Sequence, residues 1–336
     1  MEVAELPPGL SLEPWEEELS EHPLRMHWAR TGGPAKLIEW ADLRMAELGL
    51  RRSGPAEQIR TWNLSTLWRL PTPEGALWLK AVPPFFAHEG KLLKALSEST
   101  AGARVPHVLA EDAGRVLRHE IPGKDFYVVD EARALDMVSR LTELQQRWLG
   151  KTESLLALGL KDSRAPALSD SIRKLVARKA PTLGVEERYV LEAFADDLPR
   201  RFAEVEHAGL PDGLVHGDFH PGNVRGTDSE LRLLDWGDSC VGHPLLDEST
   251  FLERIPPESV PHVREHWYAL LRRMLPGSRP ERAAALLAPV VAADKAVTFQ
   301  AFLDHIEPSE HGYHRADPAT FLAHTVELLH KEYLHS

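Results

Sequence analysis

One stretch of the chain, residues 214–247, limits the folds that the chain can adopt, because it places a polar loop between short apolar segments. The apolar runs lie at 214–215 and 231–234, and the second reads as a short strand that ends next to Asp235. Interspersed glycines and prolines predict a tight loop rather than a helix; they are Gly217, Pro221, Gly222 and Gly226. The polar side chains are His216, Asp218, His220, Asn223, Asp235 and Asp238. Because hard divalent cations prefer carboxylate and amide oxygens, the stretch predicts a site for metal and phosphate.

The overall composition indicates a globular protein with room for two lobes. The chain has 336 residues, 43% of them hydrophobic, and its mean hydropathy is -0.30. No apolar run is expected to reach the length that spans a bilayer. The N-terminus is acidic and proline-rich, and it lacks the basic start and apolar centre of a signal peptide. We therefore expect a cytoplasmic protein with no membrane partner.

Charge and cysteine content narrow the partners further. The net charge of -12 disfavours nucleic acid as a partner, because phosphate backbones bind basic surfaces, whereas it permits a cationic substrate. The single cysteine, Cys240, excludes an intrachain disulfide and is typical of a reducing compartment. We interpret it as a small buried packing residue rather than a reactive thiol.

The first half of the chain predicts an N-terminal extension followed by a small β-sheet lobe. The extension, residues 1–56, is expected to contain a short helix at 15–19 and a longer one at 34–48, which begins at Pro34 and ends at Gly49. From residue 57 the hydrophobic period shortens, and residues 57–121 predict a five-stranded sheet with one inserted helix at 85–96. The predicted strands are 58–62, 65–70, 76–82, 105–111 and 115–120.

The second half predicts a helical lobe, residues 122–336, after a linker at 122–126. An apolar stripe runs from Met137 to Trp148, and Asp130 is a suitable N-cap for that helix. Further helices are expected at 168–179, 186–207, 260–274, 279–304 and 317–334. The fold class is therefore α+β, with a small antiparallel-sheet lobe and a larger, mainly helical lobe.

Five residues in chain order match the parts that phosphoryl transfer from ATP requires. That chemistry needs a lysine on the nucleotide phosphates held by a glutamate, an aspartate for the incoming hydroxyl, and an asparagine and an aspartate for magnesium. The candidates are Lys80, Glu89, Asp218, Asn223 and Asp235. The spacing of His216, Asp218 and Asn223 is that of the protein-kinase catalytic loop, with Gly217 in place of its arginine.

At these residues the sequence resembles the aminoglycoside phosphotransferase family, the small-molecule branch of the protein-kinase-like fold. HGDFHPGNV resembles its catalytic loop, and LLDWGDSCVGHPLLD its metal-binding segment. LWLKAV with HEGKLL resembles its nucleotide lysine and helix glutamate, and VLRHEIPG its last small-lobe strand and hinge. The resemblance covers about residues 57–305 and implies a two-lobed kinase-like fold.

The resemblance also implies roles for the individual residues. Asp218 is expected to be the catalytic base or to orient the acceptor hydroxyl, and Asn223 and Asp235 to bind Mg²⁺. Lys80 is expected to contact the ATP phosphates while Glu89 orients it. For the rest of the stretch we expect His216 to stabilise the loop and Asp247 to cap a helix and brace the loop. His220 is expected either near the substrate or as a structural part of the loop. Asp238 is expected either to line the substrate side or, as we favour, to cap a turn.

The sequence departs from protein kinases between its first two strands. There is no G-x-G-x-x-G, and the residues Trp62 to Thr66 stand there instead. This favours the small-molecule branch, in which backbone N–H groups or the hydroxyls of Ser65 and Thr66 would meet phosphate oxygens. The hinge residues Glu120 and Ile121 are the remaining expected nucleotide contacts.

Two other functions fit parts of the pattern. A metal-dependent hydrolase would use His216, Asp218 and His220 as ligands, but it would leave Lys80 and Glu89 unexplained. A kinase-like module without activity is the second alternative, although none of the five key residues is missing. Within the enzyme hypothesis the acceptor stays open among an amino sugar, an aminoglycoside, an amino alcohol and related metabolites.

Overall fold

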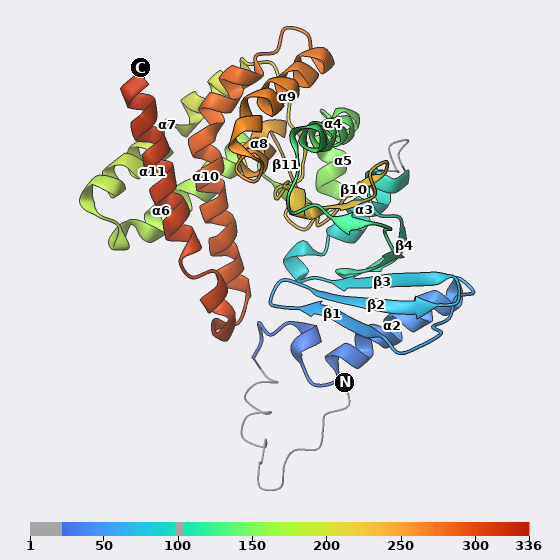
Figure 1. Ribbon diagram of the computed structural model, residues 1–336. Helices are drawn as coiled ribbons and strands as arrows, with labels where there is room; N and C mark the ends of the chain where they lie inside the picture. Colours follow the sequence, from blue (N-terminus) through green and yellow to red (C-terminus); the bar gives the residue numbers. More distant parts are fainter. Residues whose placement is uncertain (1–21, 99–103, 336) are drawn as a thin grey trace.

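The computed structural model describes residues 22–98 and 104–335, and it shows a sheet-containing lobe against a larger helical region (Figure 1). The short helix predicted at 15–19 lies outside the described residues. The kinase-like α+β class is confirmed. The predicted boundaries of the three parts, 1–56, 57–121 and 122–336, stay a prediction.

The small lobe is built on the predicted five-stranded antiparallel sheet, in the order β1-β2-β3-β5-β4. Its strands are β1 (Glu57–Thr61), β2 (Thr66–Thr72), β3 (Gly75–Ala81), β4 (Val108–Asp112) and β5 (Arg115–His119). The fourth strand begins at Val108, not at Val105 as predicted, because Pro106 has no N–H to donate to a ladder. Instead Val105 is buried in the core of the helical region.

The extension before residue 57 forms a second layer on this sheet. It contains the 3-10 turn η1 (His27–Ala29) and the helix α2 (Gly33–Glu47), which lies along one face of the sheet in Figure 1. Leu37 and Met45 of α2 are almost fully buried and belong to one apolar cluster with Trp68 and Leu70 of β2. The helix that we predicted at 34–48 is confirmed, and its apolar stripe covers the sheet.

The other face of the sheet carries the inserted helix. The predicted helix at 85–96 is wrong at its start, because the segment divides into the 3-10 turn η2 (Pro84–Phe86) and the helix α3 (Glu89–Glu98). Pro83 and Pro84 supply no N–H groups and restrict their neighbours, so the regular helix begins only after them. Consequently Glu89 occupies the first turn of α3, where the helix dipole favours an acidic side chain.

The rest of the chain is mainly helical, as predicted. Asp130 caps the first helix, since its carboxylate accepts a hydrogen bond from the Arg133 N–H at 2.8 Å. The α-helices are α4 (Glu131–Trp148), α5 (Thr152–Ala157), α6 (Ala165–Lys179), α7 (Val185–Glu206), α8 (Glu248–Leu252), α9 (Val260–Met274), α10 (Pro280–His305) and α11 (Asp317–His335). The 3-10 turns are η4 (Ala180–Thr182), η5 (Pro221–Asn223), η6 (Pro244–Asp247), η7 (Pro257–Ser259) and η8 (Pro308–Tyr313).

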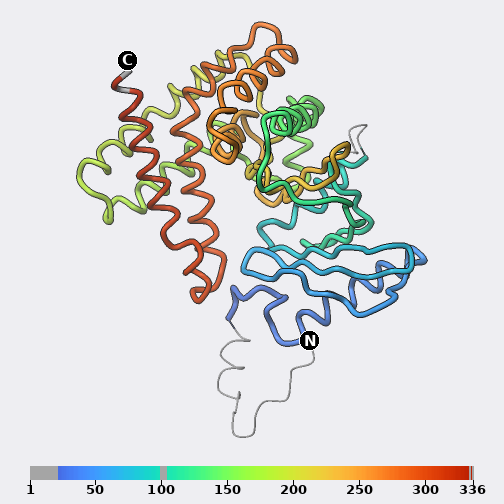
Figure 2. Tube along the Cα trace, viewed as in Figure 1, coloured from blue at the N-terminus to red at the C-terminus, as the bar shows by residue number. Residues whose placement is uncertain are grey.

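Helix α10 is the central element of the helical region. By length and composition it could cross a membrane, which corrects our expectation that no run is long and apolar enough. However, more than half of its apolar window is buried, and it packs against α6, α7 and α11 as a core helix does. Its far end reaches the small lobe, where Phe302 and Ile306 join the apolar cluster of the sheet. Figure 2 shows this end, in red, close to the blue N-terminal segment.

Two small three-stranded sheets hold the polar stretch that opened the sequence analysis. One has the order β7-β11-β8 and the other β10-β9-β6. Their strands are β6 (Lys124–Asp125), β7 (Lys161–Asp162), β8 (Gly213–Val215), β9 (Val224–Gly226), β10 (Leu231–Leu233) and β11 (Cys240–Gly242). Strand β6 lies within the predicted linker and pairs with β9, so the linker is anchored to the polar stretch.

Candidate functional site

The polar loop after β8 depends on a close backbone approach at Gly217. This residue has φ +85°, and a Cβ placed on it would lie 2.1 Å from the Asp238 carbonyl oxygen, so only glycine fits. Next to it, His216 is fully buried and its ring lies 4.4 Å from that of Trp236. Its Nε2 lies 2.9 Å from the Leu234 carbonyl oxygen, and burial lowers the pKa of His216 to about 4. His216 therefore binds loop backbone, as predicted.

Asp247 holds the start of this loop in place. Its carboxylate accepts hydrogen bonds from the N–H groups of His216 at 2.9 Å and Gly217 at 2.8 Å. The Gln145 side-chain amide donates a third, at 3.2 Å. The expected bracing role is thus confirmed, whereas the expected side-chain cap is not, because Asp247 caps α8 with no side-chain hydrogen bond. Burial raises the pKa of Asp247 to about 7, although the two backbone N–H groups favour the ionised form.

Asp218 and Asn223 lie together at the surface of the loop. The Asn223 side-chain amide donates to the Asp218 carboxylate and to its carbonyl oxygen, both at 2.9 Å. The His220 ring lies 3.4 Å from the same carboxylate, and its Nδ1 accepts a hydrogen bond from the Gly222 N–H. His220 is thus part of the loop structure. The Asp218 side chain keeps 43% of its surface exposed, so a second molecule can reach it.

Lys80, Glu89 and Asp235 join the small lobe to the polar stretch. The Lys80 ammonium lies 2.7 Å from the Glu89 carboxylate and 2.6 Å from that of Asp235. Glu89 also accepts a hydrogen bond from the Trp236 N–H at 3.2 Å. Burial acts against the charge of Lys80, but the two carboxylates raise its pKa overall. Desolvation by the surrounding site acts against the charge of Asp235 even though its side chain is more than half exposed, and Lys80 nevertheless lowers the pKa of that carboxyl.

The backbone of Asp235 is in an unusual conformation. Its φ is +60°, in the left-handed region that non-glycine residues seldom occupy, whereas its side chain is 57% exposed. Such conformations concentrate at functional sites, where the surrounding structure holds them. The strand β10 and the buried Trp236 on either side supply that support.

The residues that we expected to meet the nucleotide lie at opposite ends of β3: residues 65–66 are near Lys80, and residues 120–121 are near Ala76. Ser65 accepts a hydrogen bond from Trp62 Nε1 at 2.8 Å and stays partly exposed. Thr66 is fully buried, and its hydroxyl is engaged with Thr61 and with Trp68 Nε1, so its side chain does not face the cleft. Thr66 is the first residue of β2 and lies opposite Ala81 of β3.

The hinge residues lie at the end of β5. The Glu120 N–H donates to the Ala76 carbonyl oxygen, and the Ile121 carbonyl oxygen accepts from the Arg225 guanidinium at 3.0 Å. Among the described residues, no backbone hydrogen bond is formed by the Glu120 carbonyl oxygen or by the Ile121 N–H. The Glu120 carboxylate lies 3.2 Å from Trp78 Nε1, on the face of the sheet that also carries Lys80.

Several charged residues beside Asp218 escaped the sequence analysis. Lys161 of β7 pairs with Asp294 of α10 at 2.9 Å, and Lys295 of α10 interacts electrostatically with Asp218. Asp238 faces these groups, and burial together with Asp218 and Asp235 raises its pKa to about 8. No motif identifies Lys161 or Asp294 in the sequence, because the pair forms only when β7 packs against α10.

The hydrolase alternative is not supported by this geometry. His216 is buried against backbone, and no group of three or more His, Cys, Asp and Glu side chains in the described part of the chain is arranged to hold a metal ion. Cys240 is buried, as expected, and burial raises the pKa of its thiol to about 12.

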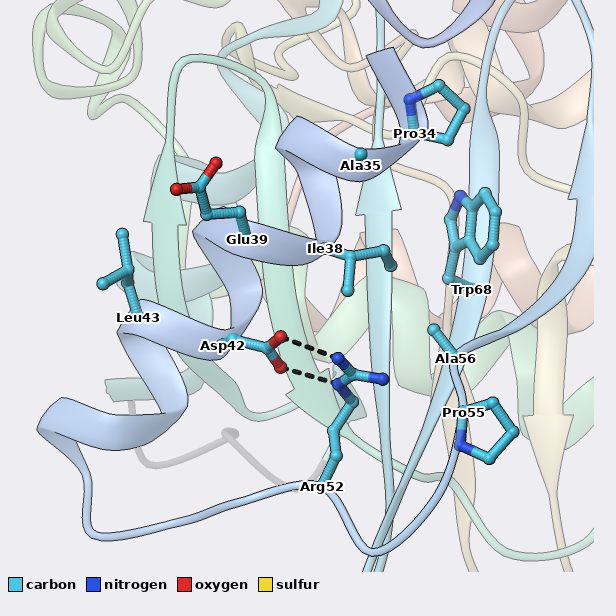
Figure 3. A pocket seen from close by; sticks show the side chains of 10 residues that line it. All are labelled: Pro34, Ala35, Ile38, Glu39, Asp42, Leu43, Arg52, Pro55, Ala56 and Trp68. Carbon is cyan, nitrogen blue, oxygen red and sulfur yellow. Dashed lines mark hydrogen bonds and ion pairs between the residues drawn. The ribbon is translucent and has the colours of Figure 1, made fainter. Parts of the chain in front are cut away.

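A pocket of about 640 Å³ on the small lobe is separate from this site (Figure 3). It lies between α2 and the first two strands, and Trp68 is part of its wall. In β2 and β3 successive side chains alternate between faces, and Trp68 is paired with Leu79 whereas Lys80 is paired with Leu67. The pocket therefore lies on the opposite face of the sheet from Lys80.

Comparison with known structures supports the kinase-like fold. A streptomycin–ATP ternary complex of the aminoglycoside phosphotransferase APH(2'')-IIa is 16% identical, with a TM-score of 0.58, over 87% of this chain and 96% of that one. The macrolide 2'-phosphotransferase MphH from Brachybacterium faecium is 18% identical, with a TM-score of 0.56, over 82% and 99%.

A third solved structure and the sequence comparisons show which family the chain belongs to. A choline/ethanolamine kinase family protein from Mesorhizobium loti is 18% identical, with a TM-score of 0.55, over 87% of this chain and 95% of that one. No curated protein sequence matches the chain. The family model described as "Phosphotransferase enzyme family" matches residues 58–307, which confirms the resemblance seen in the motifs. The chain therefore belongs to this family of phosphotransferases and is a small-molecule kinase.

Proposed function

We propose that the protein transfers the γ-phosphoryl group of ATP, with Mg²⁺, to a hydroxyl group of a small molecule. The observation that carries this proposal is the position of Lys80, which contacts Glu89 of α3 and Asp235 of the polar stretch at 2.7 Å and 2.6 Å. An ammonium group held in this way is a fixed positive charge at the junction of the two lobes. Phosphoryl transfer depends on such positioning and charge stabilisation.

Asn223 and Asp235 fit the requirements for Mg²⁺. Both present oxygen atoms from the same loop region, and the Asn223 Oδ1 has no hydrogen-bond partner among the described residues, because only its Nδ2 is bound. Mg²⁺ is commonly held by one or two such oxygens together with nucleotide phosphates and water. When bound, the ion would neutralise phosphate charge. Asp235 would then exchange its contact with Lys80 for the ion, and Lys80 would be free for the phosphates.

We propose that Asp218 binds the acceptor hydroxyl. Its carboxylate is partly exposed and is oriented by Asn223 at 2.9 Å. The hydroxyl oxygen forms a bond to the γ-phosphorus while the bond from that phosphorus to the bridging oxygen of ADP breaks. Asp218 orients the hydroxyl and accepts its proton. The products are ADP and the phosphate ester.

We assign the remaining nucleotide contacts to backbone groups of the hinge and to the residues just before β2. The Glu120 carbonyl and the Ile121 N–H supply one acceptor and one donor in the hinge, which suits an adenine edge. Ser65 is proposed to meet phosphate oxygens through its hydroxyl. Thr66 is assigned to this contact only through its backbone, because its own hydroxyl is already bonded.

For the acceptor we propose a cationic small molecule, namely an amino sugar, an aminoglycoside or an amino alcohol. Asp218, Asp238 and Asp294 supply the acidic groups near the reacting hydroxyl. The net charge of -12 disfavours nucleic acid, and the single buried cysteine suits a reducing cytoplasm.

The test is a coupled ADP-release assay with ATP and Mg²⁺ over pools of amino sugars, aminoglycosides, amino alcohols and nucleosides. We expect Asp218→Ala to abolish transfer while it still binds ATP, and Asp235→Ala to lose Mg²⁺-dependent ATP binding. Asp228→Ala, in an exposed turn of the same stretch, is the matched control. Normal turnover in the Asp218 variant would refute its role, and absence of ATP binding in the unmodified protein would refute the proposal. ATP binding without turnover in any pool would favour the inactive module.

A further inference from the structure

A second large pocket lies in the helical region, away from the proposed catalytic site. Its volume is about 1170 Å³, and it opens between the start of α6 and the end of α7. Strands β8 and β11 run from this pocket to the catalytic loop: the pocket borders the chain before Gly213 and after Gly242, whereas Asp218 follows the other end of β8. The pocket and the catalytic residues therefore lie at opposite ends of one small sheet.

Much of the pocket wall is apolar, with buried polar groups at a few positions. Its apolar lining includes Pro199, Phe202 and Val205 of α7 together with Leu210 and Leu246. A volume of this size is enough for a drug-sized organic molecule, and ligand pockets of proteins are typically apolar with a small number of placed polar groups. The polar groups of this pocket then decide which ligand fits.

His243 is a buried polar group on the wall that lacks a partner. The residue is 5% exposed, and its Nδ1 accepts a hydrogen bond from the Leu245 N–H at 3.2 Å. Burial lowers the pKa of His243 to about 3, so the ring is neutral and its proton lies on Nε2. That N–H has no acceptor among the residues that the structure describes. That nitrogen is itself covered by the surrounding residues, so a ligand in the pocket does not reach it, and the charged groups of the wall decide which ligand fits.

The charged groups of the pocket leave one carboxylate without a partner. Arg164 binds Asp162, with two contacts at 2.9 Å and 2.8 Å, and it acts on Asp212 only through the longer-range attraction of its charge. Glu206 and Arg173, which also line the pocket, are both exposed. Asp212 is half-buried and accepts no side-chain hydrogen bond within the described chain, and burial raises its pKa. A cationic amine would restore the charged form of this carboxylate.

We propose that this pocket is a second ligand-binding site, for an amphipathic amine. The apolar body would lie against α7, and the ammonium group would pair with Asp212. The site is independent of the proposed phosphoryl transfer, because it uses none of the residues assigned to that reaction.

The test uses dansylcadaverine, which combines an aromatic body, sulfonyl oxygens and a primary amine, and whose fluorescence rises in apolar surroundings. It is titrated into the full-length protein with saturating ATP and Mg²⁺, so that the nucleotide site is occupied. Ala203→Trp fills the pocket from an exposed position on α7. Ala177→Trp, exposed on α6 outside the pocket, is the matched control, and dansyl-6-aminohexanoic acid replaces the amine by a carboxylate.

We expect saturable binding that Ala203→Trp weakens about tenfold or more, whereas Ala177→Trp leaves it unchanged. Asp212→Asn is expected to weaken the amine probe and not the carboxylate probe, which binds less tightly to the unmodified protein. Equal binding to the Ala203→Trp and Ala177→Trp proteins would overturn the proposal, since the probe would then lie elsewhere. No saturable binding would overturn it as well. If Ala203→Trp does not fold, the Asp212→Asn comparison with the two probes decides alone.

Discussion

The ion pair between Arg25 and Glu307 gives the strongest prediction about how the extension and the helical region are held together. The guanidinium binds both carboxylate oxygens, at 2.8 Å and 3.0 Å, and each side chain is only 10% exposed. The pair joins the segment before α2 to the turn that follows α10. Close by, Trp28 Nε1 donates to the Trp62 carbonyl oxygen, and Trp62 Nε1 donates to Ser65. The pair therefore supports the loop that we propose to cover the phosphates.

The perturbation is Glu307→Gln, which keeps the shape of the side chain and removes its charge. A glutamine can accept from only one arm of the Arg25 fork, and its amide group faces the other arm as a second donor. Removing one partner of a buried pair leaves an uncompensated charge and destabilises a protein by about 3–5 kcal/mol. Because the Arg25 side chain retains some exposure, we expect about 3 kcal/mol, the lower end of that range.

The matched control is the pair between Arg52 and Asp42 within the small lobe, which has the same two-armed geometry (Figure 3). Its side chains are 27% and 41% exposed, so Asp42→Asn is expected to cost less than about 1 kcal/mol. Urea unfolding of Glu307→Gln and of Asp42→Asn measures the difference in stability between the two variants. Unfolding of Arg25→Met, alone and combined with Glu307→Gln, completes a double-mutant cycle for the pair. Equal losses from Glu307→Gln and Asp42→Asn, or no coupling between Arg25 and Glu307, would show that burial does not set the strength of the pair.

The same pair predicts how stability depends on pH. Burial alone would raise the pKa of Glu307, but hydrogen bonds from Arg25 and Ser309 lower it overall. A carboxyl group whose pKa is lower in the folded state stabilises the protein above its unfolded pKa, about 4.3, and this stability is lost as the pH falls through the folded pKa. The gap in unfolding free energy between the unmodified protein and Glu307→Gln should therefore narrow below about pH 4.3. A gap that stays constant to lower pH would contradict the assignment.

Three further predictions concern the polar stretch. The pKa of Asp238 is raised to about 8, so this residue destabilises the fold increasingly as the pH rises from about 4 to 8. The melting temperature of Asp238→Asn should therefore rise relative to that of the unmodified protein over this range. A difference in melting temperature that does not change with pH would argue against a buried acid. Asp247→Asn leaves an N–H of His216 or Gly217 unpaired, so it should lose about 1–3 kcal/mol of unfolding free energy. It should also slow phosphoryl transfer while ATP binding persists. Equilibrium unfolding and a nucleotide titration measure these effects. Cys240, buried with a pKa raised to about 12, should resist iodoacetamide in the native protein and react after unfolding in urea, and rapid native alkylation measured by mass spectrometry would contradict its burial.

Much of the fold could be predicted from the sequence because local pattern and tertiary packing agree there. Strand β2 and most of β3 show the alternating burial expected of a sheet with one covered face, and the helix at 34–48 buries the stripe that its spacing predicts. The order of Lys80, Glu89 and Asp235 along the chain also matched phosphoryl-transfer chemistry, and the structure brings both carboxylates within hydrogen-bonding distance of the Lys80 ammonium. The start of the helix predicted at 85–96 was wrong because the prediction gave more weight to the apolar spacing than to the two prolines.

Other contacts could not be predicted, since nothing local distinguishes their members. Arg25 and Glu307 are 282 residues apart, and Lys161 and Asp294 are 133 apart; each looks like an ordinary surface charge in its own segment. They become significant only because α10 is long enough to run from the side of the catalytic loop to the small lobe. Asp294 lies near its middle and pairs with Lys161 beside the proposed acceptor site, whereas Phe302 and the following Glu307 contact the other lobe. One core helix thus carries contacts for both the acceptor side and the nucleotide loop, so a change at its far end should affect the two sites together.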